Sequence, residues 1–444
     1  MCIFIFKNLQ MNRWLFKATD NSPLILFRII FGLLITFECW GAIATGWVRR
    51  NLIAPEFTFN FIHFDFLQPL SGNGMYIYYI VMGITGIGIM LGYRYFFNML
   101  AFTFLWAGCY LMQKTSYNNH YYLLMILNII MCLLPANKDL SLDVKFGYTK
   151  KSEFMPYWCK FTIIAQLAIV YFYASIAKLY PDWLSGKVPG LLMASKSHYH
   201  IIGDLLQENW VHMVITYVGI LFDLLIIPAL LWKPTRKFAF AFSIFFHLYN
   251  SIVLQIGIFP YLALSFILFF FPPEKIRKWF YPKNKKIILT TKPSYSNNYL
   301  IVILVSVWLV VQFALPLRHW FIPGDVLWTE EGHRLSWRMM LRQKSGTSIF
   351  YIKEIGKEEK KRVNLSDYLT RKQIRSMGGK TDMIWQFAQH LRKVYKEEGI
   401  PVEVYVDNKT KVNQSEYRQL INPNTDLAAA KWNYWGHNNW INIE

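Results

Sequence analysis

Four ionisable side chains, Lys178, His120, His247 and His319, lie inside or beside long apolar stretches of the sequence. Ionisable groups are costly within a membrane, so they are functional candidates by default. Burial disfavours the ammonium form of a lysine and makes a neutral amine available as a base near pH 7. Histidine is the other side chain that titrates close to neutral pH. These residue types indicate acid–base chemistry in a membrane protein.

Lys178 also has a structural interpretation that the sequence leaves open. A lysine near the end of an apolar helix can extend its amine to the membrane interface. Asp182 would pair with it if the helix continued, but Pro181 is expected to end the turn first.

The histidines have structural alternatives as well. The segment Asn118-Asn119-His120 can be a capping turn at a helix start. His247 can be hydrogen-bonded within its apolar helix, where Asn250 shares its face. His319, next to the last apolar block, can be a surface histidine.

The elements that must position these groups are membrane helices. The chain has 444 residues, of which 54% are hydrophobic and only 17% charged, whereas average soluble proteins carry roughly 25% charged residues. This composition excludes a disordered chain and does not fit an ordinary soluble enzyme. Because a helix needs about 20 apolar residues to cross the hydrocarbon, the sequence predicts an all-α bundle of about nine transmembrane helices, at residues 24–46, 75–93, 96–113, 121–136, 161–180, 210–232, 237–254, 256–272 and 298–316.

Basic residues give this bundle an orientation. The formal net charge is +20, and the basic residues cluster in short loops, as expected for loops facing anionic lipid rather than nucleic acid. The N-terminus and alternate loops carry 19 Lys and Arg, and the opposite loops carry 5. The positive-inside rule therefore predicts a cytoplasmic N-terminus and an extracytoplasmic or lumenal C-terminus.

The C-terminal segment has a different pattern. Residues 348–355 and 402–406 alternate between apolar and polar types, as strands do. Residues 382–396 carry apolar side chains at helical spacing. We expect two domains: a transmembrane helical domain at 1–316 and an extracytoplasmic α+β domain at 317–444.

This topology places all four candidate groups on the outer side of the membrane. One outward-opening pocket under the outer domain is the simplest arrangement. Arg28 and Asp223 fall nearer the inner side or the middle of the membrane, which favours structural roles, and Glu38 has no assigned partner. We predict no metal site, since His198 and His200 alone are a weak metal signal.

Several segments carry a family resemblance. Residues Lys114–Leu123 resemble the Lys-Thr-Ser-aromatic-Asn-Asn-His segment of vitamin K-dependent γ-glutamyl carboxylases, and Tyr171–Gly186 resembles their catalytic-lysine segment. The matches occur in order from about residue 24 to 435. Further matching blocks are Phe246–Ser251, Ile256–Tyr261, Leu315–His319, Ser336–Met340, Asp382–Met383 and Asn422–Leu427.

The resemblance implies a reaction on the outer or lumenal face. In that family a lysine removes a proton from reduced vitamin K, a quinol of the menaquinol or phylloquinol type. O2 adds to the quinol anion and a strongly basic alkoxide forms, which takes a γ-proton from a glutamate. The carbanion captures CO2, and vitamin K epoxide is the coproduct.

The resemblance also assigns residues. Lys178 matches the family base, and His120 and Asn119 match residues that orient the quinone. We therefore expect Lys178 and His120 to be catalytic, Asn118, Asn119, His247 and Asn250 to contact the quinone, and His319, His333 and Trp337 to contact a glutamate-containing peptide or protein.

The sequence departs from vertebrate members in four respects, one of which is that their lumenal disulfide has no counterpart in its cysteines. Its outer part is shorter, Gly332-His333 stands where they have a leucine–tyrosine pair, and Ala177 stands where they have a second lysine. Two alternatives to carboxylation therefore stay open: quinol epoxidation alone, and a non-catalytic membrane protein that binds or transports quinone or lipid.

Overall fold

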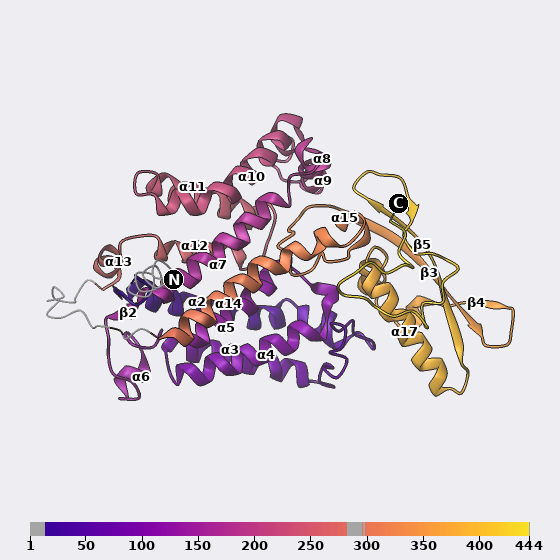
Figure 1. Ribbon diagram of the computed structural model, residues 1–444, viewed down its shortest axis with the longest axis horizontal. Helices are drawn as coiled ribbons and strands as arrows, with labels where there is room; N and C mark the ends of the chain where they lie inside the picture. Colours follow the sequence, from indigo (N-terminus) through magenta and orange to yellow (C-terminus); the bar gives the residue numbers. More distant parts are fainter. Residues whose placement is uncertain (1–13, 282–294, 296–297, 444) are drawn as a thin grey trace, which may run out of the picture.

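The computed structural model of the chain describes residues 14–281, 295 and 298–443. Figure 1 shows an elongated molecule in which long helices lie side by side. The short elements β2 (Phe154–Pro156), α6 (Leu142–Lys145) and α13 (Pro273–Phe280) lie at one end of it, and the C-terminal α+β domain lies at the other. Each candidate residue therefore lies nearer to one or the other of these two ends.

Several helices that pack along their length form the helical region. Helices α2 to α5 each pack on the next, and α7 packs on both α10 and α14. Their bounds are α2 (Ser22–Ala44), α3 (Gly74–Leu91), α4 (Tyr95–Met112), α5 (Asn119–Leu133), α7 (Tyr157–Ile176), α10 (Asn209–Leu231), α11 (Arg236–Ile252), α12 (Phe259–Ser265) and α14 (Tyr299–Ala314).

The expected count of nine membrane spans is only partly supported. In residues 14–281, 295 and 298–443, six helices are long and apolar enough to cross a membrane: α2, α3, α4, α7, α10 and α14 with its 3₁₀ extension η5 (Leu315–Phe321). A seventh span results if the bent pair 259–269 and 273–280 counts as one.

Three of the expected spans differ from simple long helices. Helix α5 has 15 residues, which at about 1.5 Å per residue falls short of the roughly 30 Å hydrocarbon core. Helix α11 has 17 residues and begins with Arg236 and Lys237. The block expected at 256–272 forms α12 and the 3₁₀ helix η4 (Phe266–Phe269), and the chain then turns by 116° into α13.

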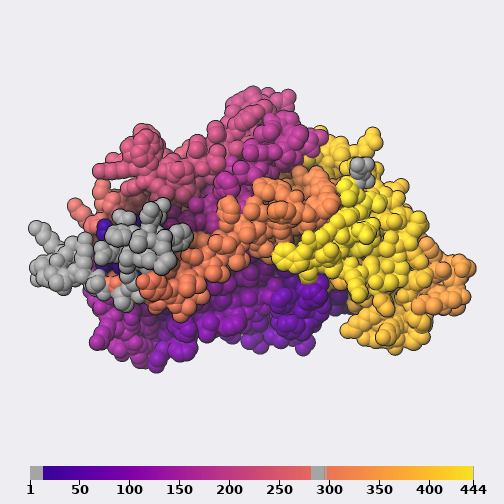
Figure 2. Space-filling model, viewed as in Figure 1, coloured from indigo at the N-terminus to yellow at the C-terminus, as the bar shows by residue number. Residues whose placement is uncertain are grey.

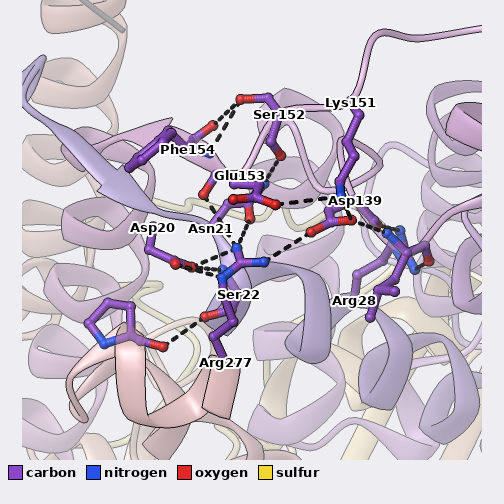
Figure 3. Close-up of polar contacts among 12 residues, drawn as sticks. Asp20, Asn21, Ser22, Arg28, Asp139, Lys151, Ser152, Glu153, Phe154 and Arg277 are labelled. Carbon is purple, nitrogen blue, oxygen red and sulfur yellow. Dashed lines mark hydrogen bonds and ion pairs between the residues drawn. The ribbon is translucent and has the colours of Figure 1, made fainter. Parts of the chain in front are cut away.

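A buried ionic cluster fixes the end of the molecule opposite the C-terminal domain. Arg277 of α13 donates to the carboxylate of Asp20 at 2.7 and 2.9 Å and to Asp139 at 3.2 Å (Figure 3). Arg28 of α2 is fully buried and donates to backbone carbonyls of the segment 136–140 at 2.6–3.3 Å. These contacts join α2, α13 and the loop before β2, which supports a structural role for Arg28.

The C-terminal domain is an antiparallel sheet with helices packed on one face. The strand order is β4-β3-β5-β6, with β3 (Lys344–Glu354), β4 (Lys360–Arg362), β5 (Val402–Val412) and β6 (Arg418–Gln419). Side chains of β3 and β5 alternate between buried and exposed, and Phe350 pairs with Val406 on the buried face. Helix α17 (Thr381–Glu397) covers that face. The predicted strands and helix are therefore confirmed, with β3 starting four residues earlier than expected.

The C-terminal domain contacts the ends of the membrane helices. Figure 2 shows it covering one end of the molecule. Its helix α16 (Arg371–Met377) contacts η2 (Lys114–Ser116), which precedes α5, and Lys372 donates to Asn51 and Ser116 at 2.6 and 2.9 Å. The outer domain and the helix ends therefore share one interface.

Candidate functional site

Lys178 forms a buried ion pair across two helices. It lies just beyond the end of α7 and is 9% exposed. Its Nζ donates to the carboxylate of Asp223 in α10 and to the carbonyl of Ala174 at 3.1 Å, and it lies 5.6 Å from the ring centre of Trp183. Lys178 is thus held by charge and packing rather than extended to the interface.

Asp182 is not the partner of this lysine. Pro181 begins the short helix α8 (Pro181–Leu184), and the Asp182 carboxylate accepts instead from Lys187 at 3.3 Å and from Asn413 at 2.8 Å. The expectation that Asp223 lies apart from Lys178 and the other candidate residues was wrong. The available signal was a lone carboxylate in an apolar helix, which needs a cation in low dielectric.

His120 and His247 meet around one aromatic ring. The His120 ring stacks on Phe259 with centroids 4.2 Å apart, and His247 lies 6.1 Å from the same ring. The His247 Nε2 and the Tyr171 hydroxyl are 3.3 Å apart. The α7–α10 groove, about 320 Å³ in volume, is lined by Tyr171 and Asp223 among mostly apolar residues. Of its lining residues, Tyr171 contacts His247 and Asp223 contacts Lys178.

The neighbouring asparagines have different contacts. The Asn118 side chain accepts from the Tyr121 N–H at 2.8 Å and so caps α5. Asn119 donates to the carbonyl of Arg338 at 2.9 Å. Asn250 is buried in α11, one turn after His247. Asn119 therefore ties the start of α5 to the segment 330–342, which we call the strap.

The strap has an unusual backbone. Glu330, Leu335, Trp337 and Met340 have positive φ angles of 67°, 61°, 55° and 51°, a conformation that costs roughly 1–2 kcal/mol per non-glycine residue. Trp337 is fully buried, its ring lies 4.8 Å from that of Tyr122, and its Nε1 has no hydrogen-bond partner in the described part of the chain. Such strain persists only where the surroundings impose it, and it is common at functional sites.

His319 lines a cavity of about 430 Å³ between the end of α7 and the strap. Its Nδ1 donates to the carbonyl of Pro316 at 2.7 Å, so Nε2 is the acceptor that faces Arg338 Nη1 at 3.3 Å. Ala177 and Leu179, on either side of Lys178, also line this cavity. We call it the His319 cavity.

A second cavity, of about 550 Å³, lies on the other side of the strap, and we call it the basic cavity. Within the part of the chain that the structure describes, Glu330 supplies the one carboxylate in its lining, and His333 also lines it. The lining cations are Arg338, Arg342, Lys344, Lys372, Arg375 and Lys380. A cavity with this lining is suited to bind anions.

The charges of the basic cavity perturb one another. Burial by itself raises the pKa of Glu330, but Arg342 and Lys344 hold that pKa well below its ordinary value. Burial lowers the pKa of Lys344 and of Lys380 to about 8. Burial and the charge of Arg342 lower the pKa of His333 well below its ordinary value, so this histidine is neutral at pH 7.

The described contacts link the four candidate groups only in part. His120 and His247 lie beside Phe259, Lys178 pairs with Asp223, and His319 lines a cavity together with Ala177 and Leu179, the chain neighbours of Lys178. A single pocket that holds all four groups stays a prediction. Sequence reasoning also missed the basic cavity, although arginine recurs at every fourth position at 334, 338 and 342.

Two family models match the chain. Residues 16–275 match the HTTM domain. Residues 297–443 match the lumenal domain of vitamin K-dependent gamma-carboxylase. The chain belongs to the vitamin K-dependent gamma-carboxylase family. The family resemblance is thereby confirmed. The strap lies within the lumenal-domain match, whereas both cavities are also lined by residues of the 16–275 match, such as Ala177 and Thr115. No solved structure matches the chain.

Proposed function

We propose that this protein oxidises reduced vitamin K with O2 and couples that oxidation to the carboxylation of glutamate side chains by CO2. The observation that carries the proposal is the basic cavity, which adjoins the His319 cavity across the strap. An anion-binding chamber beside a site with a buried lysine is what glutamate carboxylation needs. Quinol epoxidation alone gives no reason for it.

The α7–α10 groove fits a lipid quinol. Its lining is apolar except for Tyr171 and Asp223, and it lies on membrane helices. The Nδ1 of His247 is buried without a partner in the described residues, so it is available to a quinone oxygen. Reduced vitamin K, of the menaquinol or phylloquinol type, would supply with O2 the strong base that abstracts the γ-proton.

Lys178 is proposed as the general base. Its amine can accept a proton only after it has given one up, and the Asp223 carboxylate is hydrogen-bonded to Nζ and able to receive it. The surrounding low dielectric disfavours separated charges, so exchange of the proton within the pair costs less there than in water. His120, stacked on Phe259, is proposed as the second catalytic residue.

The remaining candidates are proposed to hold the two substrates. Asn118, Asn119, His247 and Asn250 would hold and orient the quinone from α5 and α11. His319, His333 and Trp337 would contact the glutamate-containing peptide or protein from the strap side. Burial of the strap against Tyr122 keeps water away from this region, as a carbanion requires.

The membrane arrangement is part of the proposal. We propose nine crossings, with α5, α11 and the broken segment α12–η4 completing the six longer helices. The N-terminus would be cytoplasmic, and the domain boundary would fall near residue 316. The lysine, the strap and both cavities would then lie at the extracytoplasmic side, where a periplasmic or lumenal substrate is available.

The test is an assay of the purified protein in lipid nanodiscs with reduced vitamin K, a glutamate peptide and labelled CO2. We expect vitamin K epoxide and labelled γ-carboxyglutamate in equal amounts. Epoxide without label in the peptide would replace the proposal by quinol epoxidation. Absence of both products would remove the enzymatic proposal and leave a binding or transport protein.

A further inference from the structure

Arg338 belongs to the walls of both cavities. It is a strap residue that lines the His319 cavity on one side and the basic cavity on the other. Its backbone carbonyl accepts the Asn119 side chain, so the position of the residue is fixed to the start of α5. A ligand in either cavity can therefore reach the same guanidinium group.

Arg338 differs from the neighbouring strap arginines in its partners. Arg334 pairs with Asp382 and Arg342 pairs with Glu330. Among the residues that the structure describes, Arg338 forms no salt bridge, and its Nη1 faces the neutral Nε2 of His319. The buried Nε atoms of all three arginines lack a hydrogen-bond partner there, so the difference lies in the missing carboxylate. A guanidinium group has five N–H donors in a fixed fork, and most of those of Arg338 are left for a ligand.

The charge surroundings agree with this geometry. Burial and the charge of Arg342 lower the pKa of Arg338 to about 10. The guanidinium still carries its charge at pH 7, in a place where cations outnumber carboxylates. An anion would supply the missing counter-charge.

We propose that Arg338 is the residue that binds the γ-carboxylate of the peptide glutamate at the boundary between the two cavities. The planar fork accepts a carboxylate in a bidentate manner. This arrangement keeps the carboxylate on the side of the basic cavity and turns the adjacent methylene toward the His319 cavity. The inference rests on the proposed function, which it deepens by naming the substrate-recognition residue.

The experiment measures binding without turnover. A fluorescent pentapeptide with one central glutamate, and its glutamine counterpart, are titrated with the full chain in nanodiscs that contain no quinol. The wild type should bind the glutamate peptide about tenfold or more tightly, as expected for a charge-assisted pair. Arg338→Gln should lower this Glu/Gln ratio about tenfold, and Arg338→Lys should restore part of it, because lysine keeps the charge but not the fork.

The matched control is Arg371→Gln. Arg371 is an exposed arginine of α16 and does not line the basic cavity, so the ratio should be that of the wild type. If Arg338→Gln does not fold, as judged by thermal unfolding, Arg338→Lys decides, since it should lower the ratio without removing it. Bicarbonate is added in a separate titration. It tests whether Arg338 binds this free anion instead of the peptide carboxylate.

The outcomes separate this inference from the proposed function. An unchanged ratio in the folded Arg338→Gln or Arg338→Lys variant overturns the inference, as does a wild type that does not discriminate the two peptides. Bicarbonate that abolishes the discrimination at millimolar concentration also overturns it in favour of the free anion. A ratio that depends on Arg338 in a protein that forms neither epoxide nor γ-carboxyglutamate supports the inference and refutes only the proposed reaction.

Discussion

Lys178 and Asp223 lie on different helices and are 45 residues apart in the sequence, yet they form a single buried pair. A buried charge without its partner is strongly destabilising, so neither group would be stable as an ion here alone. The pair also gives a proton two adjacent positions, on Nζ and on the carboxylate. This arrangement is the reason that we assign the base to Lys178 and treat Asp223 as its positioning residue.

Substitution of the lysine tests this assignment. Lys178→Ala should lower the rate of epoxide formation by about 10²–10⁴, the usual contribution of a general base. Lys178→Arg should not restore the rate, because arginine stays protonated in proteins. Epoxide is quantified by chromatography after reaction with reduced vitamin K. The control is Lys187→Ala, which removes a half-exposed lysine paired with Asp182 and should leave the rate unchanged. Near-normal epoxidation by Lys178→Ala would remove the base assignment.

A second residue-scale prediction concerns pH. Lys344 and Lys380 line the basic cavity and have their pKa values lowered to about 8 by burial. A lysine is charged below its pKa and the peptide glutamate is ionised above about pH 5, so peptide binding should be constant between about pH 6 and 7 and weaken as pH rises from 7 to 9. The double variant Lys344→Arg/Lys380→Arg should keep its affinity over that range. The measurement is peptide binding without quinol, and identical pH profiles for the two proteins would contradict it.

At the scale of the element, the strap decides how the cavities are separated. Four of its non-glycine residues have positive φ, so the segment does not follow helix or strand geometry. Its path is defined by contacts with several elements, including α5, η5 and α17. At Gly332 the strap lies directly against His319. This glycine has a φ of 73°, and a Cβ added there would lie 2.7 Å from the Cβ of His319. A glycine is required for both reasons.

Gly332→Ala should therefore lower stability and activity together. The substitution adds strain of about 1–2 kcal/mol from the backbone and displaces His319 from its cavity. Gly356→Ala is the matched control, since that glycine has a φ of 89° but no atom within 4 Å of an added Cβ. We expect a lower melting temperature for both variants and a loss of carboxylation only for Gly332→Ala. Equal activity losses would show that contact with His319 does not matter.

At the scale of the whole molecule, the two ends differ in their balance of cations and carboxylates. The cluster around Arg277 closes one end with carboxylates for its cations (Figure 3). The opposite end, under the C-terminal domain, holds more cations than carboxylates around the basic cavity. At the first end, the charge of Arg277 is already balanced by carboxylates. At the second end, cations exceed carboxylates, so they can bind an anionic ligand. Substrate is therefore expected at the end covered by the C-terminal domain.

The proposed orientation predicts which parts a protease can reach. Protease added to cells whose outer barrier is permeabilised should remove the C-terminal domain, with first cuts at the exposed lysines of the β3–β4 hairpin, Lys357 and Lys361. A tag at the N-terminus should stay protected. In inverted membrane vesicles the pattern should reverse. Protection of the C-terminal domain in the permeabilised cells would refute the topology and the extracytoplasmic site together.

The sequence alone determined the helical membrane region, the α+β nature of the C-terminal segment and the family. Apolar runs, strand alternation and helical spacing are local properties, so α17 and β5 appear where the pattern predicts them. The residue types of the candidate site were visible for the same reason. Lys178, His120, His247 and His319 stand out because ionisable side chains are rare beside apolar blocks.

Only the tertiary structure decided which of these groups meet. Whether Lys178 pairs with Asp182 or with Asp223 depends on where Pro181 ends a turn and on how α7 packs against α10. Among the described residues Arg338 has no carboxylate partner, because Asp382 of α17 reaches Arg334 and Glu330 reaches Arg342. Electrostatic partners are set by distance in space, and an apolar pattern along the chain carries no information about that distance.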